Sequence, residues 1–272
     1  MSILTIQIAV AGASLYVETR GDGPLLLLIP GGPADAGVFS AVAGVLSDRY
    51  KVVSYDPRGN SRSHFADEPT EFDMNVMGDD AAVIIAAFGS EAFVFGNSGG
   101  AQIALNLTAR YPQLVRALIA HEPPCTRLLA NHADVEKQMN AVVQTYNEQG
   151  TREGMAAFHR MVSSTPSLSP NSAPESDVVE TAARIRKNFD YFLGQAASGI
   201  ADYRPDLERL RASKVKMTVG LGRDSRGELA NRTALALAEQ LPAPRLEFPG
   251  GHGGFTSHPA LFAEVLYQAF NA

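Results

Sequence analysis

The fold of this chain is most constrained by a series of short apolar runs in which polar residues do not alternate with apolar ones. These runs are "PLLLLIP" (24–30), "KVVSYD" (51–56), "AFVFGN" (92–97), "VRALIAH" (115–121), "KVKMTVGLG" (214–222) and "RLEFPG" (245–250). Apolar residues without alternation predict strands that are covered on both faces, as in a parallel sheet between helices. Two earlier segments, "LTIQIAV" and "ASLYVET", are separated only by Ala11-Gly12 and predict an antiparallel hairpin.

Segments with helical periodicity separate most of the predicted strands. They lie at 38–48, 75–88, directly after Ser98, at 228–241 and at 259–270. The order of strands and helices predicts an α/β fold, with a doubly wound, mostly parallel eight-stranded sheet that has an antiparallel start.

One long interval, 123–213, interrupts this alternation with helical stripes instead of strands. The stripe "DVEKQMNAVVQTYNEQG" ends at Gly150, a plausible C-cap, and a second stripe covers 155–162. A Ser/Pro-rich stretch then precedes a third stripe at 178–195. We therefore expect a core made of 1–122 and 214–272, and a helical cap or lid inserted at 123–213.

Composition excludes several classes of function. The net charge is −6, and basic residues are not clustered, so neither nucleic acid nor an anionic membrane is expected as the main partner. The single cysteine, Cys125, excludes an internal disulfide or a multi-cysteine zinc site and is expected to be a small apolar filler. The start of the chain has no basic segment before its apolar residues, and no apolar run is long enough to span a bilayer. We expect a cytoplasmic protein that acts on a small molecule and needs no metal or cofactor.

The stretch "GNSGG" carries the strongest chemical signal in the sequence. Gly96-Asn97-Ser98-Gly99-Gly100 satisfies the pattern G-x-S-x-G and lies between a predicted buried strand and a predicted helix, which is the context that a nucleophilic serine requires. Glycines two residues before and after the serine let strand and helix pass closely at a strained turn. The pattern favours Ser98 as a nucleophile over an ordinary turn serine.

A nucleophilic serine needs a base and a carboxylate that orients the base. Among six histidines, His252 lies just after the last predicted strand and before the final helix, where a loop residue can reach the carboxyl edge of the sheet. Asp224 follows the penultimate strand and completes the order Ser…Asp…His, so it is the predicted carboxylate. Glu122 in "AHEPP" is the competing candidate, and Asp224 could instead be a solvated loop residue.

Backbone amides are expected to stabilise an oxyanion beside Ser98. Gly99 follows the nucleophile and would supply one N–H group. Gly32, in the glycine-rich turn "IPGGPAD" after the third predicted strand, would supply the other. The alternative for "IPGGPAD" is an ordinary tight turn.

These motifs together resemble the α/β-hydrolase superfamily over nearly the whole chain. "PGGP" is similar to the family's His-Gly-x-Pro oxyanion loop, "YDPRGNSRS" to its Tyr-Asp-x-Arg-Gly-x-Gly-x-Ser stretch, "GNSGG" to its nucleophile turn and "GGH" to its histidine loop. The resemblance implies that Asp56 and Arg58 are structural and pin the loop beside the oxyanion turn. The chain departs from the family at Pro30, where histidine is usual, and at Asn60-Ser61, where a small residue and glycine are usual.

The main functional hypothesis is a cofactor-independent serine hydrolase of a small, fairly apolar carboxylic ester or lactone. Two alternatives stay open: hydrolysis of a C–C bond in a vinylogous diketone, and ligand binding with negligible turnover. Aromatic and methionine side chains of the insertion could wall the pocket, although packing within the cap is the stronger alternative for each. These residues are Met139, Tyr146, Phe158, Met161, Phe189, Tyr191 and Phe192. The sequence specifies neither the substrate nor the oligomeric state.

Overall fold

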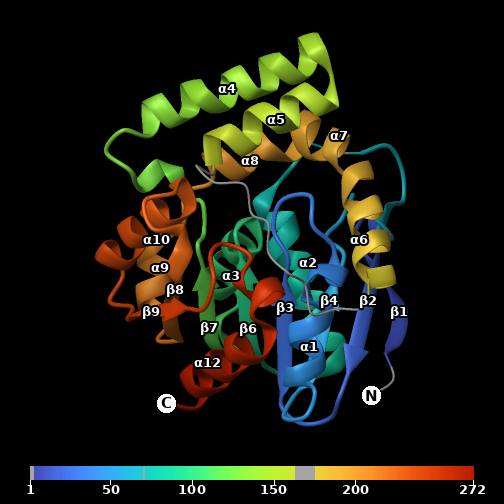
Figure 1. Cartoon of the computed structure of the whole chain (residues 1–272). Helices are drawn as coiled ribbons and strands as arrows, with labels where there is room; N and C mark the ends of the chain where they lie inside the picture. The colour runs from blue at the N-terminus through green and yellow to red at the C-terminus, as the bar shows by residue number, and fades with distance from the viewer. Residues whose placement is uncertain (1–2, 70, 163–174) are drawn as a thin grey trace.

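The computed structural model describes residues 3–69, 71–162 and 175–272, which form one mixed sheet flanked by helices (Figure 1). The main path of the sheet runs β1-β2-β4-β3-β6-β7-β8-β9. These eight strands are β1 (Leu4–Val10), β2 (Ala13–Arg20), β3 (Leu25–Ile29), β4 (Lys51–Tyr55), β6 (Ala92–Asn97), β7 (Val115–His121), β8 (Lys216–Gly222) and β9 (Arg245–Phe248). The predicted eight-stranded sheet is confirmed. A two-residue strand, β5 (His64–Phe65), pairs with β2 beside this path and was not expected.

The strand directions match the expected antiparallel start and parallel remainder. In the β1–β2 hairpin, Val10 pairs with Ala13, which places Ala11-Gly12 in the turn as predicted. β2 also pairs antiparallel with β4. From β4 to β9 all pairings along the main path are parallel, so the carboxyl ends of these strands share one edge of the sheet.

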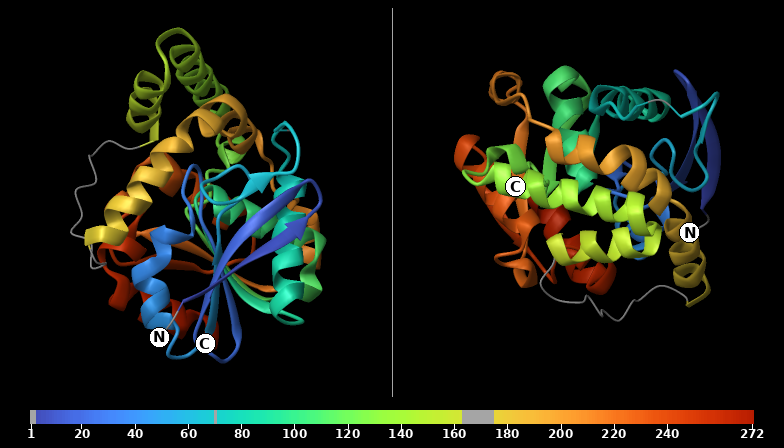
Figure 2. Two further views of the ribbon diagram at one scale, coloured as in Figure 1. Left: turned by 90° about the vertical axis from the view of Figure 1, so that its right-hand side faces the viewer. Right: turned by 90° about the horizontal axis from the view of Figure 1, so that it is seen from above.

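Helices cover both faces of the sheet, as the views in Figure 2 show. One face packs on α1 (Ser40–Leu46) and α12 (Pro259–Asn271). The other packs on α2 (Met74–Phe88), α3 (Gly99–Arg110) and α10 (Leu229–Gln240). In β3, Leu26 and Leu28 join the first core, whereas Leu25, Leu27 and Ile29 join the second. Burial of both faces explains why the runs show no alternation.

The expected helical interval lies between β7 and β8. It contains α4 (His132–Gln149), α5 (Thr151–Val162), α6 (Glu175–Lys187), α7 (Phe189–Tyr191), a π-helical turn (Phe192–Ala196), α8 (Ala197–Asp202) and α9 (Leu207–Ala212). We call α4 to α8 the inserted helices. Gly150 ends α4 with φ +89°, which confirms the predicted C-cap. Most of the Ser/Pro-rich stretch lies outside the described residues.

The inserted helices α4, α5, α7 and α8 lie together over the carboxyl edge of the sheet in Figure 1. Helix α6 lies at the side of the sheet, against the turn Ala36–Phe39. The inserted helices have a small apolar core of their own, which includes Met139, Met155 and Phe192. By contrast, Leu210 of α9 is fully buried in the core on the α3 side of the sheet. The division into a core and a cap at 123–213 stays a prediction, and α9 packs with the core.

Cys125 is fully buried in the same core as Leu210. Burial raises the pKa of the Cys125 thiol to about 12, which keeps it protonated at neutral pH. This placement matches the expected role as an apolar filler. No helix within the described residues is both long and apolar enough to cross a membrane.

Candidate active site

Ser98 occupies a sharp turn between β6 and α3. Its backbone adopts φ 57° and ψ −128°, a conformation that non-glycine residues rarely adopt. A side chain at Gly96 would collide with the backbone of Gly100 and Ala101, and one at Gly100 would collide with the backbone of Ile29. The strained turn and the need for glycine on either side of Ser98 are therefore as the motif predicted.

His252 lies in the loop after β9 and has a buried carboxylate partner. Its Nδ1 lies 2.8 Å from Oε2 of Glu122, whose side chain is fully buried. Glu122 directly follows β7, with φ +49°, and its N–H group donates to the carbonyl oxygen of Gly220 in β8. The Glu122 carboxylate thus approaches His252 from the carboxyl end of β7.

The second oxygen of Glu122 is held by three donors. Oε1 accepts hydrogen bonds from the N–H group of Gly222 at 2.9 Å, from Asn231 Nδ2 at 3.2 Å and from the hydroxyl of Ser225. Burial alone would raise the pKa of Glu122, but the bonds from His252 and Ser225 and the nearby His121 lower it to about 2. An ionised Glu122 accepts a hydrogen bond from Nδ1–H, so Nε2 of a neutral His252 can accept a proton.

The prediction that Asp224 orients His252 is corrected by this geometry. Asp224 is exposed in the short turn Arg223–Ser225 after β8. The next residue, Ser225, is 1% exposed and binds Glu122, so the turn directs Ser225 inward and leaves Asp224 at the surface. The competing candidate, Glu122, is the carboxylate that contacts His252.

Ser98 and His252 lie at the same edge of the sheet. Asn97 pairs with His121 across β6 and β7, and the N–H group of Ser98 donates to the carbonyl oxygen of His121 at 2.9 Å. The ring centroids of His121 and His252 are 6.4 Å apart. Among the described residues no hydrogen bond joins Ser98 Oγ to His252, a contact that often tightens only when substrate binds. Transfer of a proton between them stays a proposal.

His121 is a fully buried neighbour of this site. Its Nδ1 lies 2.8 Å from Asn97 Oδ1, and its ring packs against Phe95, Phe248 and Phe262. Burial lowers the pKa of His121 to about 4, although Glu122 opposes this effect, so the imidazole is neutral at pH 7. The neutral His121 therefore holds Asn97, the residue before Ser98, without adding a positive charge to the site. In the sequence, His121 is recognisable only as the last residue of the predicted strand at 115–121.

Gly32 and Gly99 are adjacent, as the oxyanion prediction requires. A Cβ atom built on Gly99 would lie 3.2 Å from the nitrogen of Gly32, and both glycines line one cavity. Gly32 has φ +56°, which favours glycine. The structure brings the two residues together, and their action as donors stays a proposal.

The residues expected to be structural also contact this region. Oδ1 of Asp56 accepts a hydrogen bond from the N–H group of Ala36 at 2.9 Å, so Asp56 holds the loop after Gly32. Arg58 instead forms a buried ion pair with Asp80, with Nη2 and Oδ1 2.7 Å apart. Arg58 therefore fixes the loop after β4 to α2.

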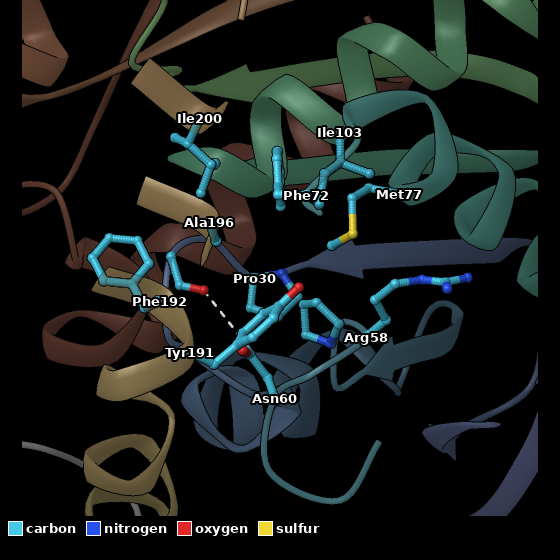
Figure 3. A pocket seen from close by; sticks show the side chains of 13 residues that line it. Pro30, Arg58, Asn60, Phe72, Met77, Ile103, Tyr191, Phe192, Ala196 and Ile200 are labelled. Carbon is cyan, nitrogen blue, oxygen red and sulfur yellow. Dashed lines mark hydrogen bonds between the residues drawn. The ribbon is translucent and has the colours of Figure 1, made fainter. Parts of the chain in front are cut away.

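The cavity beside the two glycines has about 370 Å³ of empty volume, part of it open to solvent. Figure 3 shows side chains from the core and from the inserted helices around it. The lining residues are Pro30, Gly32, Pro57, Arg58, Asn60, Phe72, Met77, Gly99, Ile103, Tyr191, Phe192, Ala196 and Ile200. The walls are predominantly apolar, as a pocket for a small apolar substrate would be.

Only two of the predicted pocket residues, Tyr191 and Phe192, line this cavity. The other five pack in or against the core of the inserted helices: Met139, Tyr146, Phe158, Met161 and Phe189. Sequence reasoning missed Ile103, although it lies four residues after Gly99 on α3 and therefore on the same helix face. Phe72 and Met77 gave no comparable signal, because only the fold brings α2 and the segment before it to the cavity.

A model of the alpha/beta hydrolase fold family matches residues 24–159 of this chain. An uncharacterized hydrolase of Bacillus subtilis, YraK, is 34% identical over 98% of this chain and 96% of its own length. A zearalenone hydrolase of Cladophialophora bantiana is 29% identical over 94% of this chain and 92% of its own length. The chain belongs to the α/β-hydrolase family and is a hydrolase.

Solved structures confirm the fold. An enol-lactonase of Burkholderia xenovorans is 17% identical, with a TM-score of 0.73 over 98% of this chain and 100% of its own. An esterase of Thermogutta terrifontis is 21% identical, with a TM-score of 0.70 over 100% of this chain and 98% of its own. At these identities the likeness concerns the fold alone.

Proposed function

We propose that this protein is a serine hydrolase that cleaves a small, fairly apolar carboxylic ester or lactone through an acyl-enzyme on Ser98. The observation that carries the proposal is the 2.8 Å hydrogen bond between His252 and the buried Glu122, at the sheet edge where Ser98 occupies its strained turn. A buried carboxylate bound to Nδ1 of a histidine is the arrangement that activates a serine hydroxyl.

The proposed reaction begins when Ser98 Oγ attacks the substrate carbonyl carbon and His252 Nε2 takes the hydroxyl proton. Glu122 stabilises the resulting imidazolium, and the N–H groups of Gly32 and Gly99 stabilise the oxyanion. His252 then gives its proton to the leaving alkoxide. A water molecule, deprotonated by His252, attacks the acyl group, and the carboxylic acid leaves with Ser98 restored.

The walls of the cavity support an apolar, neutral substrate. Phe72, Ile103 and Ile200 offer apolar surface, whereas the guanidinium of Arg58 is already bound to Asp80. The relatives named zearalenone hydrolase add one specific compound to the candidates. We therefore place zearalenone in the substrate panel beside simple esters and lactones.

The test is labelling with a fluorophosphonate probe, which reacts with activated serines. We expect the wild-type protein to be labelled and the Ser98→Ala variant to be neither labelled nor active on the panel. Ser257→Ala is the control, because Ser257 bonds to its neighbour His258, and this variant should keep both labelling and turnover.

A panel that also contains a vinylogous diketone separates the two alternative functions, C–C hydrolysis and ligand binding without turnover. Turnover of the diketone without turnover of esters or lactones would favour C–C hydrolysis. Tight binding of a panel compound without turnover would favour a ligand-binding protein. An unlabelled wild-type protein that cleaves no ester or lactone would exclude the proposed function.

A further inference from the structure

The loop that carries Gly32 is bound by an asparagine of the inserted helices. Asn188, between α6 and α7, is only 4% exposed. Its Nδ2 donates to the carbonyl oxygen of Pro33 at 2.8 Å and to Ser61 Oγ at 2.9 Å. Its Oδ1 accepts a hydrogen bond from the N–H group of Ser61 at 2.8 Å. All three contacts join the inserted helices to loops of the core.

The bond to Pro33 connects Asn188 with Gly32 through two peptide units. The carbonyl of Pro33 and the N–H group of Ala34 belong to one planar unit. This N–H group donates to the carbonyl oxygen of Gly31 at 3.1 Å. The carbonyl of Gly31 and the N–H group of Gly32 form the second unit. In a trans peptide the N–H group points opposite to the carbonyl, so the orientation of each unit fixes the direction of its N–H group.

A second asparagine holds the other carbonyls of this turn. Asn60, which is 3% exposed, donates through Nδ2 to the carbonyl oxygens of Gly32 at 3.0 Å and Ala34 at 2.9 Å. Figure 3 shows Asn60 beside the cavity, with its bond to Gly32 dashed. Three successive carbonyls, 32 to 34, therefore accept from two asparagine amides. Asn60 comes from the core, whereas Asn188 comes from the inserted helices.

We propose that Asn188 is a positioning residue of the oxyanion hole, which directs the N–H group of Gly32 through the Pro33–Ala34 and Gly31–Gly32 peptide units. The inference rests on the proposed function, because it assigns Asn188 a part in the same reaction. Hydrogen bonds in such a chain also polarise one another, which strengthens the donor at its end. Docking of the inserted helices is then a condition for stabilising the oxyanion, in addition to walling the cavity.

The variant that tests this assignment is Asn188→Asp. Aspartate has nearly the same size and can still accept from the N–H group of Ser61, but it presents a carboxylate oxygen to the carbonyl of Pro33. We expect kcat on a small ester to fall about tenfold or more, because loss of a whole oxyanion donor costs roughly 100- to 1,000-fold and a misdirected one costs part of that. KM should stay within about threefold, since the apolar walls are unchanged.

Two further measurements separate positioning from a general structural role. An aryl boronic acid, which forms a tetrahedral adduct with a nucleophilic serine, should bind more weakly to Asn188→Asp by a factor close to the loss in kcat. The carboxylic acid product should bind almost unchanged. Ser61→Ala is the matched control: it removes one acceptor of Asn188 but keeps the bond to Pro33, so kcat should stay within about twofold of the wild type.

Amide hydrogen exchange at Ala34 tests the connection without relying on turnover. Exchange should be faster in Asn188→Asp and Asn188→Ala than in Ser61→Ala, because the Pro33–Ala34 unit is no longer held. Unchanged exchange would overturn the inference, as would a folded Asn188→Asp variant with wild-type kcat or with a change in KM alone.

A wild-type protein that neither reacts with fluorophosphonate nor cleaves any compound of the panel would instead exclude the proposed function. Exchange at Ala34 would still show whether Asn188 holds the loop. Should Asn188→Asp fail to fold, Asn188→Ala carries the kinetic test.

Discussion

Glu122 reaches His252 because its backbone departs from the strand at φ +49°, a conformation that turns the side chain into the sheet edge. Its carboxylate then has a donor for each of its oxygens: His252 binds Oε2, and Gly222, Ser225 and Asn231 bind Oε1. This arrangement leaves an ionised carboxylate in a fully buried position. The direction of the His252 ring therefore depends on contacts among β7, β8 and α10.

Replacement of Glu122 by glutamine should reduce kcat by at least about 100-fold. A glutamine amide that turns its NH2 group toward His252 selects the tautomer with a proton on Nε2, which cannot accept a proton from Ser98. If the NH2 group turns the other way, it faces the donors at Gly222 and Ser225. Steady-state kinetics on the best ester or lactone of the panel measures the effect.

The matched control for this variant is Asp224→Asn. Asp224 is exposed and has no part in the His252 contact, so its kcat should stay within about twofold of the wild type. A larger loss for Asp224→Asn than for Glu122→Gln would restore Asp224 as the orienting carboxylate.

His121 should make the stability of the protein depend on pH between about 6.5 and 4. The pKa of His121 is lowered to about 4, so the unfolded chain binds a proton in this range while the folded chain does not. Stability therefore rises with pH through this window and falls on acidification. From pH 7 to pH 5 the expected loss from His121 is about 2 kcal/mol.

The variant His121→Asn tests this dependence. Asparagine can keep a donor toward Asn97 but does not titrate. Denaturant unfolding at pH 7 and pH 5 should show a smaller acid-induced loss for the variant than for the wild type, even though the variant is less stable at both pH values. Equal losses in the two proteins would exclude His121 as the source.

At the level of elements, the close approach of β3 to the start of α3 fixes the turn at Ser98. A side chain at Gly100 would collide with the carbonyl group of Ile29 in β3. Gly100→Ala should therefore lower the free energy of unfolding by about 2 kcal/mol or more, and should reduce fluorophosphonate labelling as Ser98 moves. Denaturant unfolding and labelling rates check both expectations.

Gly44 in α1 provides the control for this substitution. It is exposed in the helix interior, and a Cβ there would have no heavy atom within 4 Å. Gly44→Ala should raise the free energy of unfolding by about 0.5–1 kcal/mol through helix propensity alone. If both alanines had the same effect, the close approach at Gly100 would not be what requires glycine.

The same elements show which parts of the fold could be predicted from the sequence. The central parallel strands β3, β4, β6 and β7 were predictable because burial on both faces leaves an apolar run in the sequence. The β1–β2 hairpin was predictable for a different reason, since only Ala11-Gly12 separates its two strands. Ser98 was predictable because its strain and its glycines are local. By contrast, α8 and α9 have only six residues each, too few to show a helical period.

Neither the carboxylate partner of His252 nor the residues that line the cavity could be predicted from local sequence patterns. Both Glu122 and Asp224 follow strands, and the choice between them depends on Ser225 and Asn231, which are more than 100 residues from Glu122 in sequence. The aromatic stripe of the inserted helices has the same spacing whether it faces a ligand or its own core. Tyr191 and Phe192 lie at the cavity and Phe158 lies away from it because of how the helices pack against one another. Such packing produces no periodic pattern in the sequence.

On the scale of the whole molecule, the cavity lies between the carboxyl edge of the sheet and the inserted helices. Arg58 is the one charged residue among the described residues that line it, and its guanidinium is bound to Asp80. A substrate carboxylate in this cavity would lose its water without gaining a free cation.

The protein should therefore prefer a neutral diester to the half-ester of the same diacid. We expect kcat/KM to be at least about tenfold higher for the neutral compound at pH 7, a difference of roughly 1.4 kcal/mol. A dimethyl and a monomethyl ester of one diacid form a matched pair, because they differ mainly in charge. Equal kcat/KM values would mean that a cation is available to the substrate.

The hydrogen bond from Asn188 to Pro33 also bears on how far the inserted helices can be treated as an exchangeable module. Engineers who graft the lid of one hydrolase onto another usually select for a new substrate wall. In this chain, such a graft would also remove an amide that binds the loop of Gly32. A chimera would need an asparagine restored at this junction, whatever substrate its new helices were chosen to admit.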